Sequence, residues 1–263
     1  MIRVTTVILL LTLVPSFADC EGIIFQLPPD GHWASYTIDN TLFSPDGTQH
    51  KYPAKMILRS VGREMVGEIP CRWIEIETSG EYLGVPAHSI EKVLIAEHAL
   101  QSGQEPLKEA YRYIHYYPNN NQFRSEKDRK RLQYRSIDDR KKLQDLFQDE
   151  DRNQEHGLDR IFHGAYEDVK RITTPQIVLS KLGERECEGI LANVTEEQGD
   201  RTTQYKNVFR IHPDSPFGVV QWETLCSSKS DGKTVMKFHQ VMLLSDYGTN
   251  AKSAIPEQNK FGL

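Results

Sequence analysis

The residues of this sequence that could do chemistry are its histidines and its closely spaced carboxylates. Nine histidines are scattered along the chain. His156 and His163 lie seven residues apart beside Glu155 and Asp159, and a helix would place both imidazoles on one face, where they could bind a metal ion. Neither H-E-x-x-H nor another familiar metal-ligand spacing occurs. We therefore interpret these residues as polar surface groups in a charge-rich segment, and we expect no metal site.

A second candidate for chemistry is the carboxylate pair Glu75 and Glu77, which a strand would place on one face. We interpret the pair as a solvated strand end, because it follows Cys71 and Trp73 towards the end of the run. The chain has no G-x-S-x-G, no glycine-rich phosphate loop and no Cys/His nucleophile signature. The sequence thus names no reaction. We expect a protein without a cofactor and without catalytic activity, and keep a hydrolase as the third hypothesis.

Aromatic side chains offer a different kind of site. Large aromatic residues usually fill the core, but they can also line an apolar pocket. Our candidates for a ligand-lining role are Trp73, Tyr111, Ile114, Trp222 and Phe238.

The N-terminus has the pattern of a secretory signal peptide. Arg3 precedes an apolar run from Val4 to Val14, and the small-residue site Ser16-Phe17-Ala18 follows. An alternative is a lipid anchor on Cys20, but Phe17 and Asp19 do not fit a bacterial lipobox. The run is too short to span a bilayer, and no later segment is long and apolar enough to do so. We expect an exported protein, periplasmic or extracellular, without a transmembrane segment.

Length and charge limit the class of protein further. Removal of 18 of the 263 residues leaves 245, enough for one large β-rich domain. The formal charge of −5 becomes −6 without Arg3, which argues against nucleic-acid binding. The four cysteines, Cys20, Cys71, Cys187 and Cys226, allow two disulfides in three connectivities and contain no C-x-x-C spacing.

Strand patterns dominate the first eighty residues. Residues 55–78 read as strand, turn and strand, with Ile74 and Ile76 on one face and Cys71 and Trp73 on the other. Because both faces carry apolar groups, this strand needs cover on both sides. Upstream, Ser44-Pro45-Asp46-Gly47 predicts the turn of a hairpin.

The middle of the chain changes character. Leu107, Ala110, Tyr111 and Ile114 have helical spacing after Pro106, which predicts a helix packed on the sheet. Residues 124–155 then hold ten Lys or Arg and nine Asp or Glu, which predicts an exposed helical insertion. Strand patterns return until about residue 245, with turns expected at 196–202, 212–218 and 227–233.

Four motifs occur in an order that resembles a family of uncharacterised exported bacterial proteins: VGREMVGEIPCRWIEIE, VLIAEHALQSGQEPLKEAY, DSPFGVVQWE and DYGTNAKSAIPE. This resemblance covers about two thirds of the mature chain and implies export and a β-rich domain, with no implied activity. At the level of the fold alone, the expected order of elements is similar to the periplasmic lipoprotein carriers (LolA-like), which are open half barrels that shelter acyl chains. No carrier site residue can be matched in this sequence.

Together these observations predict an α+β protein dominated by an antiparallel meander sheet or open half barrel, with helices packed on it. We expect a signal peptide at 1–18, a single domain at 19–247 with a charged helical insertion at about 119–157, and a flexible tail at 248–263. The leading functional hypothesis is an exported, non-enzymatic protein that binds an apolar ligand such as a lipid or acyl chain. The alternative is an envelope or extracellular structural or interaction module without a small-molecule ligand.

The N-terminal pattern makes a direct prediction about processing. We expect cleavage after Ala18, because a small residue there follows the apolar run. Intact-mass analysis of the exported protein should give a chain that begins at Asp19. A mature chain that begins with an acylated Cys20 would contradict this and place the protein on a membrane surface.

Overall fold

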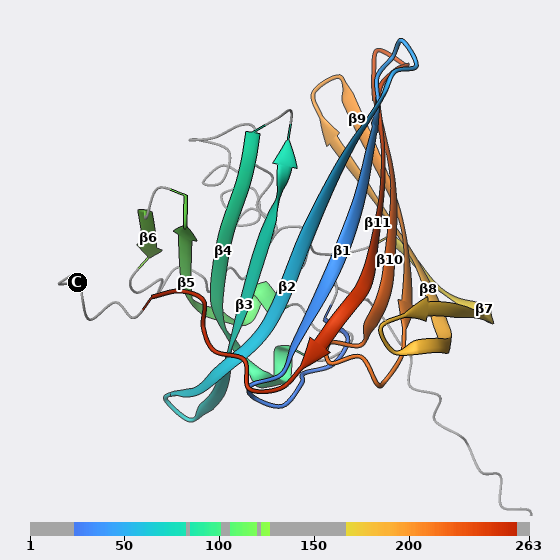
Figure 1. Ribbon diagram of the computed structural model, residues 1–263. Coiled ribbons are helices and arrows are strands. Elements are labelled where there is room, and N and C mark those ends of the chain that lie inside the picture. The colour runs from blue at the N-terminus through green and yellow to red at the C-terminus, as the bar shows by residue number, and fades with distance from the viewer. Residues whose placement is uncertain (1–23, 83–84, 101–105, 120–121, 127–166, 257–263) are drawn as a thin grey trace, which may run out of the picture.

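In the computed structural model the described residues are 24–82, 85–100, 106–119, 122–126 and 167–256 (Figure 1). The expected signal peptide, Cys20, His156, His163 and most of the expected insertion lie outside these ranges. Within them the protein is all-β. Helical structure is limited to two short 3-10 segments, η1 (Glu97–Ala99) and η2 (Pro106–Glu109).

The described chain forms eleven strands: β1 Trp33–Phe43, β2 Gln49–Val66, β3 Ile69–Tyr82, β4 Val85–Ala96, β5 Ala110–Tyr117, β6 Gln122–Glu126, β7 Glu167–Ser180, β8 Gly183–Gln198, β9 Arg201–Ile211, β10 Val219–Ser230 and β11 Lys233–Gly248.

These strands make one open antiparallel sheet in the order β6-β5-β4-β3-β2-β1-β11-β10-β9-β8-β7 (Figure 1). Strands that follow each other in sequence pair, except β6 and β7, which form the two edges, and at the centre β1 pairs with β11. Their register runs from Trp33 opposite Gly248 to Phe43 opposite Lys237, with an irregularity between Ser35 and Tyr36. Two meanders, β1 to β6 and β7 to β11, are therefore joined along a single seam.

Turn residues define the hairpin ends as the sequence predicts. In the first hairpin the Gly47 amide donates to the Ser44 carbonyl at 2.9 Å, and Asp46 accepts from the Thr48 amide at 2.9 Å. Between β10 and β11, Asp231 and Gly232 have φ values of 51° and 72°. Two consecutive positive φ angles are what a two-residue type I′ hairpin requires, and Asp-Gly adopts them readily.

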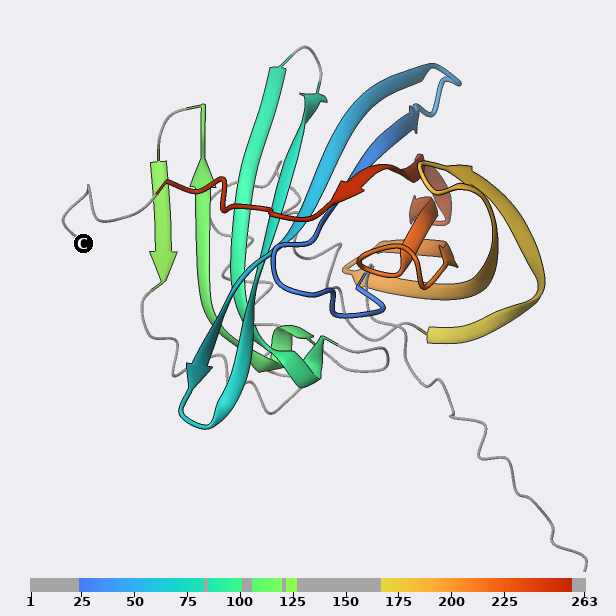
Figure 2. The ribbon, with the colours of Figure 1, turned by 60° about the horizontal axis from the view of Figure 1, so that its bottom comes forward.

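The sheet is strongly curved, and its β7 to β11 part curls furthest (Figure 2). As a result, β7 approaches β10 and β11 as well as its hydrogen-bonded neighbour β8. The Lys181 amide, just after β7, donates to the Leu244 carbonyl on β11 at 3.2 Å. One face of the sheet is thereby enclosed and the other faces outwards.

The apolar core lies on the enclosed face, which we call the inner face and which carries Tyr36, Leu58, Ile76, Phe209 and Met242. All five are almost completely buried. Core positions follow the two-residue alternation of strands, and opposed residues continue a row across the sheet, as Leu58 opposite Ile76 does. Hydrophobic burial on this face is the main stabilising contribution that the described residues offer.

The expected helix over 107–114 is wrong, and with it the α+β class. Pro106–Glu109 is one 3-10 turn and Ala110–Tyr117 is strand β5, paired with β4. The helical spacing of four apolar residues was a coincidence in a segment, AYRYIHYY, whose aromatic and β-branched residues favour strands. Pairing with β4 also gives the backbone N–H and C=O groups of this segment hydrogen-bond partners, whereas an isolated short helix is only marginally stable.

Part of the expected insertion also belongs to the sheet. Gln122–Glu126 forms the edge strand β6, opposite residues 113–117 of β5. The sheet therefore extends one hairpin further than the sequence indicated.

Tyr36 provides a test of the seam. Its ring is fully buried on the inner face, and its hydroxyl donates to the Val219 carbonyl on β10 at 3.2 Å. We expect Tyr36→Ala to lower the free energy of unfolding by about 3–5 kcal/mol, as large-to-small changes of buried aromatic residues do. Urea denaturation should measure this, with Tyr247→Ala on β11 as the control. Tyr247 is 41% exposed, so its truncation should cost no more than about 0.5 kcal/mol.

Candidate functional site

The inner face of β9 and β10 carries an aromatic stack. Trp222 stacks on Phe209 with ring centroids 5.5 Å apart, and Phe209 meets Phe25 edge to face at 5.4 Å. The Trp222 indole N–H donates to Asn207 Oδ1 at 3.1 Å, which also accepts from the Thr224 hydroxyl at 2.8 Å. A polar group thus lies directly beside the stacked rings, deep inside the curled part of the sheet.

The inner face of β4 and β5 carries a different polar pair. Glu91 and His115 are opposite each other in register and only 2% and 5% exposed. His115 packs against Tyr117, with centroids 4.0 Å apart, and against Tyr113 at 6.2 Å. A carboxylate beside an imidazole can orient the ring and hold a proton. By itself it does not make a catalytic site, which also requires a nucleophile or a bound metal.

The sequence-predicted site residues do not converge on one place. Trp222 and Phe238 lie on the inner face of β10 and β11. Trp222 and Cys226 are four residues apart on β10 and so share a face, and Cys226 is opposite Phe238. Tyr111 packs against the same core from β5. Ile114 instead packs in a small second cluster with Ile90, Tyr116 and Ile255.

The cluster that contains Ile114 is on the outer face. Trp73 lies on this outer face too, and among the described residues it packs against neither a helix nor the core of the inner face. Its indole N–H donates to Glu64 at 3.3 Å, and the Lys92 ammonium lies 5.3 Å from the ring centroid in a cation–π contact. The five candidates therefore divide into an inner group of three and an outer group of two.

A cluster of paired charges lies on the same face of the sheet as this tryptophan. Arg59 donates to Glu75 at 3.0 Å and also to Glu77, and His88 Nε2 lies 2.9 Å from Glu77. The Glu75 side chain is completely buried, so the interpretation of this pair as a solvated strand end is wrong. Burial is possible because every charge in the cluster has an opposite partner and further hydrogen bonds.

The C-terminal segment covers Glu75 from outside. After β11 the chain crosses the outer face (Figure 2), where the Ser253 hydroxyl and the Ala254 amide donate to Glu75 at 2.6 and 2.9 Å. Lys92 donates to the Ser253 hydroxyl at 3.1 Å, and Ile255 is 8% exposed. These contacts differ from the flexible tail expected from residue 248 onwards. The reason is that the buried Glu75 carboxylate needs hydrogen-bond donors, and this segment provides them although it has no periodic pattern.

Electrostatics favour the charged form of Glu77 in this network. Burial alone raises the pKa of Glu77, but the hydrogen bonds from Arg59 and His88 outweigh it and hold the pKa below its usual range. Burial lowers the pKa of Lys92, and the neighbouring Glu75 opposes that effect. The outer-face network is therefore a structural anchor for the tail.

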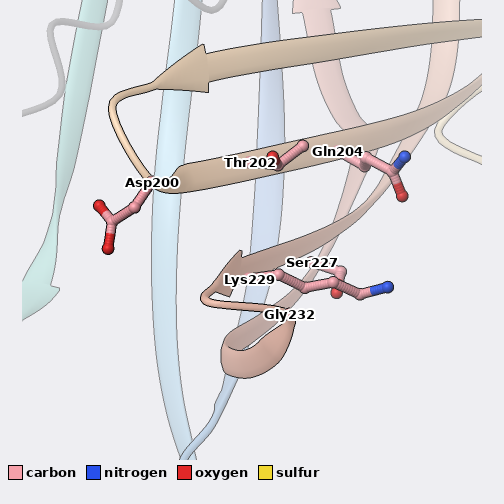
Figure 3. A pocket seen from close by; sticks show the side chains of 6 residues that line it. All are labelled: Asp200, Thr202, Gln204, Ser227, Lys229 and Gly232. Atoms are coloured by element: carbon pink, nitrogen blue, oxygen red, sulfur yellow. The ribbon is translucent and has the colours of Figure 1, made fainter.

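A small polar depression lies at the tips of two hairpins (Figure 3). It has a volume of about 200 Å³ and is lined by Asp200, Thr202, Gln204, Ser227, Lys229 and Gly232. Four of the residues are paired positions of β9 and β10, such as Gln204 opposite Ser227, and Asp200 and Gly232 lie in the adjoining turns. Asp200 already accepts a hydrogen bond from Ser230 at 2.8 Å. This is the surface of a solvated hairpin pair, and we assign it no ligand.

Metal, thiol and membrane features are limited in the described part of the chain. No group of His, Cys, Asp and Glu there could hold a metal ion, and no helix there is long and apolar enough to cross a membrane. No disulfide joins Cys71, Cys187 and Cys226, which are buried on β3, β8 and β10. Burial raises the pKa of the Cys71 and Cys187 thiols, which disfavours the reactive thiolate.

Comparison with known proteins gives remote structural likenesses. No protein-family model and no curated protein matches the sequence. A structure described as a "putative lipoprotein" from Parabacteroides distasonis is 11% identical, with a TM-score of 0.35 over 88% of this chain and 100% of that chain. A "putative exported protein" with a YmcC-like fold from Bacteroides fragilis is 9% identical, with a TM-score of 0.34 over the same shares. A DUF1329 family protein from Desulfovibrio piger is 12% identical, with a TM-score of 0.29 over 88% of this chain and 89% of that one. Likeness at these scores supports no inference about ligand or activity.

Several inner-face residues were missed by sequence reasoning. Glu91 and Asn207 stand at core positions of alternating strands, in the runs SIEKVLIA and TQYKNVFR. A polar residue at a position where the alternation demands an apolar one is a usable signal. Their partners, His115 and Thr224, come from other strands, and nothing in a single sequence indicates those pairings.

The Glu77 network predicts a pH dependence. A carboxyl whose pKa is depressed on folding contributes stability that is fully present above its unfolded pKa, about 4.3, and is lost as the pH falls through the folded value. We therefore expect Glu77→Gln to lower the free energy of unfolding near about pH 6, and the difference from wild type should vanish as the pH falls through the lowered pKa of Glu77. Urea denaturation across this pH range should measure the difference.

Glu81→Gln, at an exposed position of the same strand, is the control. A Glu77→Gln difference that stays constant with pH would contradict the assignment.

Proposed function

We propose that this protein is an exported, non-enzymatic binding protein whose curved sheet takes an apolar molecule, such as a lipid or an acyl chain, on its inner face. The observation that carries the proposal is the division of chemistry between the two faces. Apolar and aromatic side chains run in rows over the inner face, while the Arg59, Glu75 and Glu77 ion pairs lie on the outer face. A curved sheet with one apolar face is a common way to shelter a hydrophobic ligand.

The margin of the inner face would supply the ligand contacts. Its centre is closed by close packing, as Phe209 and Met242 are almost fully buried. Phe238, Tyr111 and Leu42 are only half-buried and so keep surface available for a ligand. Burying such surface stabilises a complex by about 25 cal/mol for each Å².

A second candidate function is an interaction module, which a separate observation favours. The edge strand β7 exposes Ile177 and Leu179 by 73% and 69%. Within the described residues its outer edge has no strand partner, so another chain could add a strand there. Such a module would carry no small molecule, and this distinguishes the two candidates.

Native mass spectrometry with solvent extraction tests the binding proposal, on protein purified from its own envelope or medium. We expect a co-purified apolar molecule and displacement of it by a fluorescent fatty-acyl probe. Phe238→Ala should weaken probe binding about tenfold, because it removes an aromatic contact from the margin of the inner face.

Met65→Ala is the control. Met65 is 58% exposed near the end of β2, far along that strand from His50, where the row of Phe238 and Leu42 reaches β2, so its truncation should leave probe affinity unchanged. A wild-type protein that carries no apolar molecule and binds no acyl probe would defeat the proposal and favour the interaction module.

A further inference from the structure

Four polar side chains form one row across the inner face of four adjacent strands. Asn40 on β1 is opposite Gln240 on β11, Gln240 is opposite Thr224 on β10, and Thr224 is opposite Asn207 on β9. Opposed residues in antiparallel strands share a face. Neighbouring strands are about 4.8 Å apart, so the four residues span about 14 Å. We call this set the amide row.

The hydrogen bonds of the amide row are incomplete. Asn207, Thr224 and Gln240 are 4%, 6% and 7% exposed. Asn207 and Thr224 bond to each other, and Trp222 donates to Asn207. Among the described residues, however, Oδ1 of Asn40 is buried without a partner, and the Gln240 amide has no side-chain hydrogen bond. A buried amide oxygen without a partner, such as that of Asn40, is costly, and a native protein that keeps one usually has a ligand or water to supply the missing bond.

On β1, β11 and β10, the rows that flank the amide row contain no charge. The row on one side holds Ile38, Met242 and Trp222, and the row on the other side holds Leu42 and Phe238. Among the described residues no charged side chain stands in these three rows on β1, β11 and β10. A carboxylate or ammonium group placed here would be buried without an opposite charge, which is strongly unfavourable.

We infer that the amide row is the polar subsite of the inner face and that the ligand is a long apolar molecule carrying an uncharged polar group, such as an alcohol, ester or amide. This inference rests on the proposed function and adds the chemical class of the ligand. Side-chain amides both donate and accept, so Asn40 and Gln240 can bond a carbonyl or a hydroxyl. The flanking apolar rows hold the chain on either side of that group.

Four ligands with the same alkyl chain provide the test: hexadecanol, methyl hexadecanoate, hexadecanoate and hexadecane. Each is titrated against the fluorescent acyl probe on the full mature protein. We expect the alcohol and the ester to bind about tenfold more tightly than the alkane and the carboxylate, the gain from a neutral hydrogen bond in a dry site. Gln240→Leu should remove this preference while leaving the affinity for hexadecane unchanged.

The thermal midpoint separates a binding role of Gln240 from a structural one. In the ligand-free protein Gln240→Leu should melt at the same temperature as wild type or higher, because it replaces an amide that makes no side-chain hydrogen bond with an apolar side chain on the inner face. Gln221→Leu, the same change at an outer-face position of β10, is the matched control and should alter no ligand preference.

The outcomes separate this inference from the proposed function. Equal affinity of wild type for hexadecanol and hexadecane would overturn the amide row as a subsite and leave the binding function standing. The same conclusion would follow if Gln240→Leu kept the preference and melted at a lower temperature. Failure of all four ligands to displace the probe would overturn both.

Discussion

The pairing of β1 with β11 is the constraint on which the rest of the structure depends. Each meander can form hairpin by hairpin from local contacts, but the seam joins residues about two hundred positions apart. Before it forms, β1 and β11 are both edge strands, and the inner rows of the two meanders are not continuous. The seam therefore fixes which side chains are opposite each other across the middle of the inner face. Asn40 and Gln240 become neighbours only through this pairing.

Curvature follows from the size and twist of the sheet. A twisted open sheet of about ten strands tends to curl, because the strand-to-strand rotation accumulates. Here the curl brings β7 back towards β10 and β11 and encloses Phe209 and Trp222 without a covering helix among the described residues. One sheet thereby supplies both walls of its own core. The same geometry leaves the margins half-buried, where Phe238 and Leu42 lie.

The outer face is organised by charge. Glu75 is fully buried beside Arg59 and accepts hydrogen bonds from Ser253 and the Ala254 amide. Removing Arg59 would leave the buried Glu75 carboxylate without its opposite charge, which is why such networks hold a defined geometry. The C-terminal segment is therefore part of the fold as far as Ile255. Its local sequence has no periodic pattern, so its order depends entirely on groups of the sheet.

The sequence by itself determined the strands that alternate clearly and the turns that depend on particular residues, such as Ser44 to Gly47 and Asp231 with Gly232. Those features are local, since side-chain alternation and positive φ angles depend on a few neighbouring residues. Residues 110–117 were misassigned because apolar spacing alone does not distinguish a short helix from a strand, and pairing with β4 decides between them. The burial of Glu75, the outward position of Trp73 and the alignment of the amide row were decided by tertiary structure alone. Each depends on which strand lies beside which, and in an antiparallel sheet that is settled by register between distant segments rather than by any local preference.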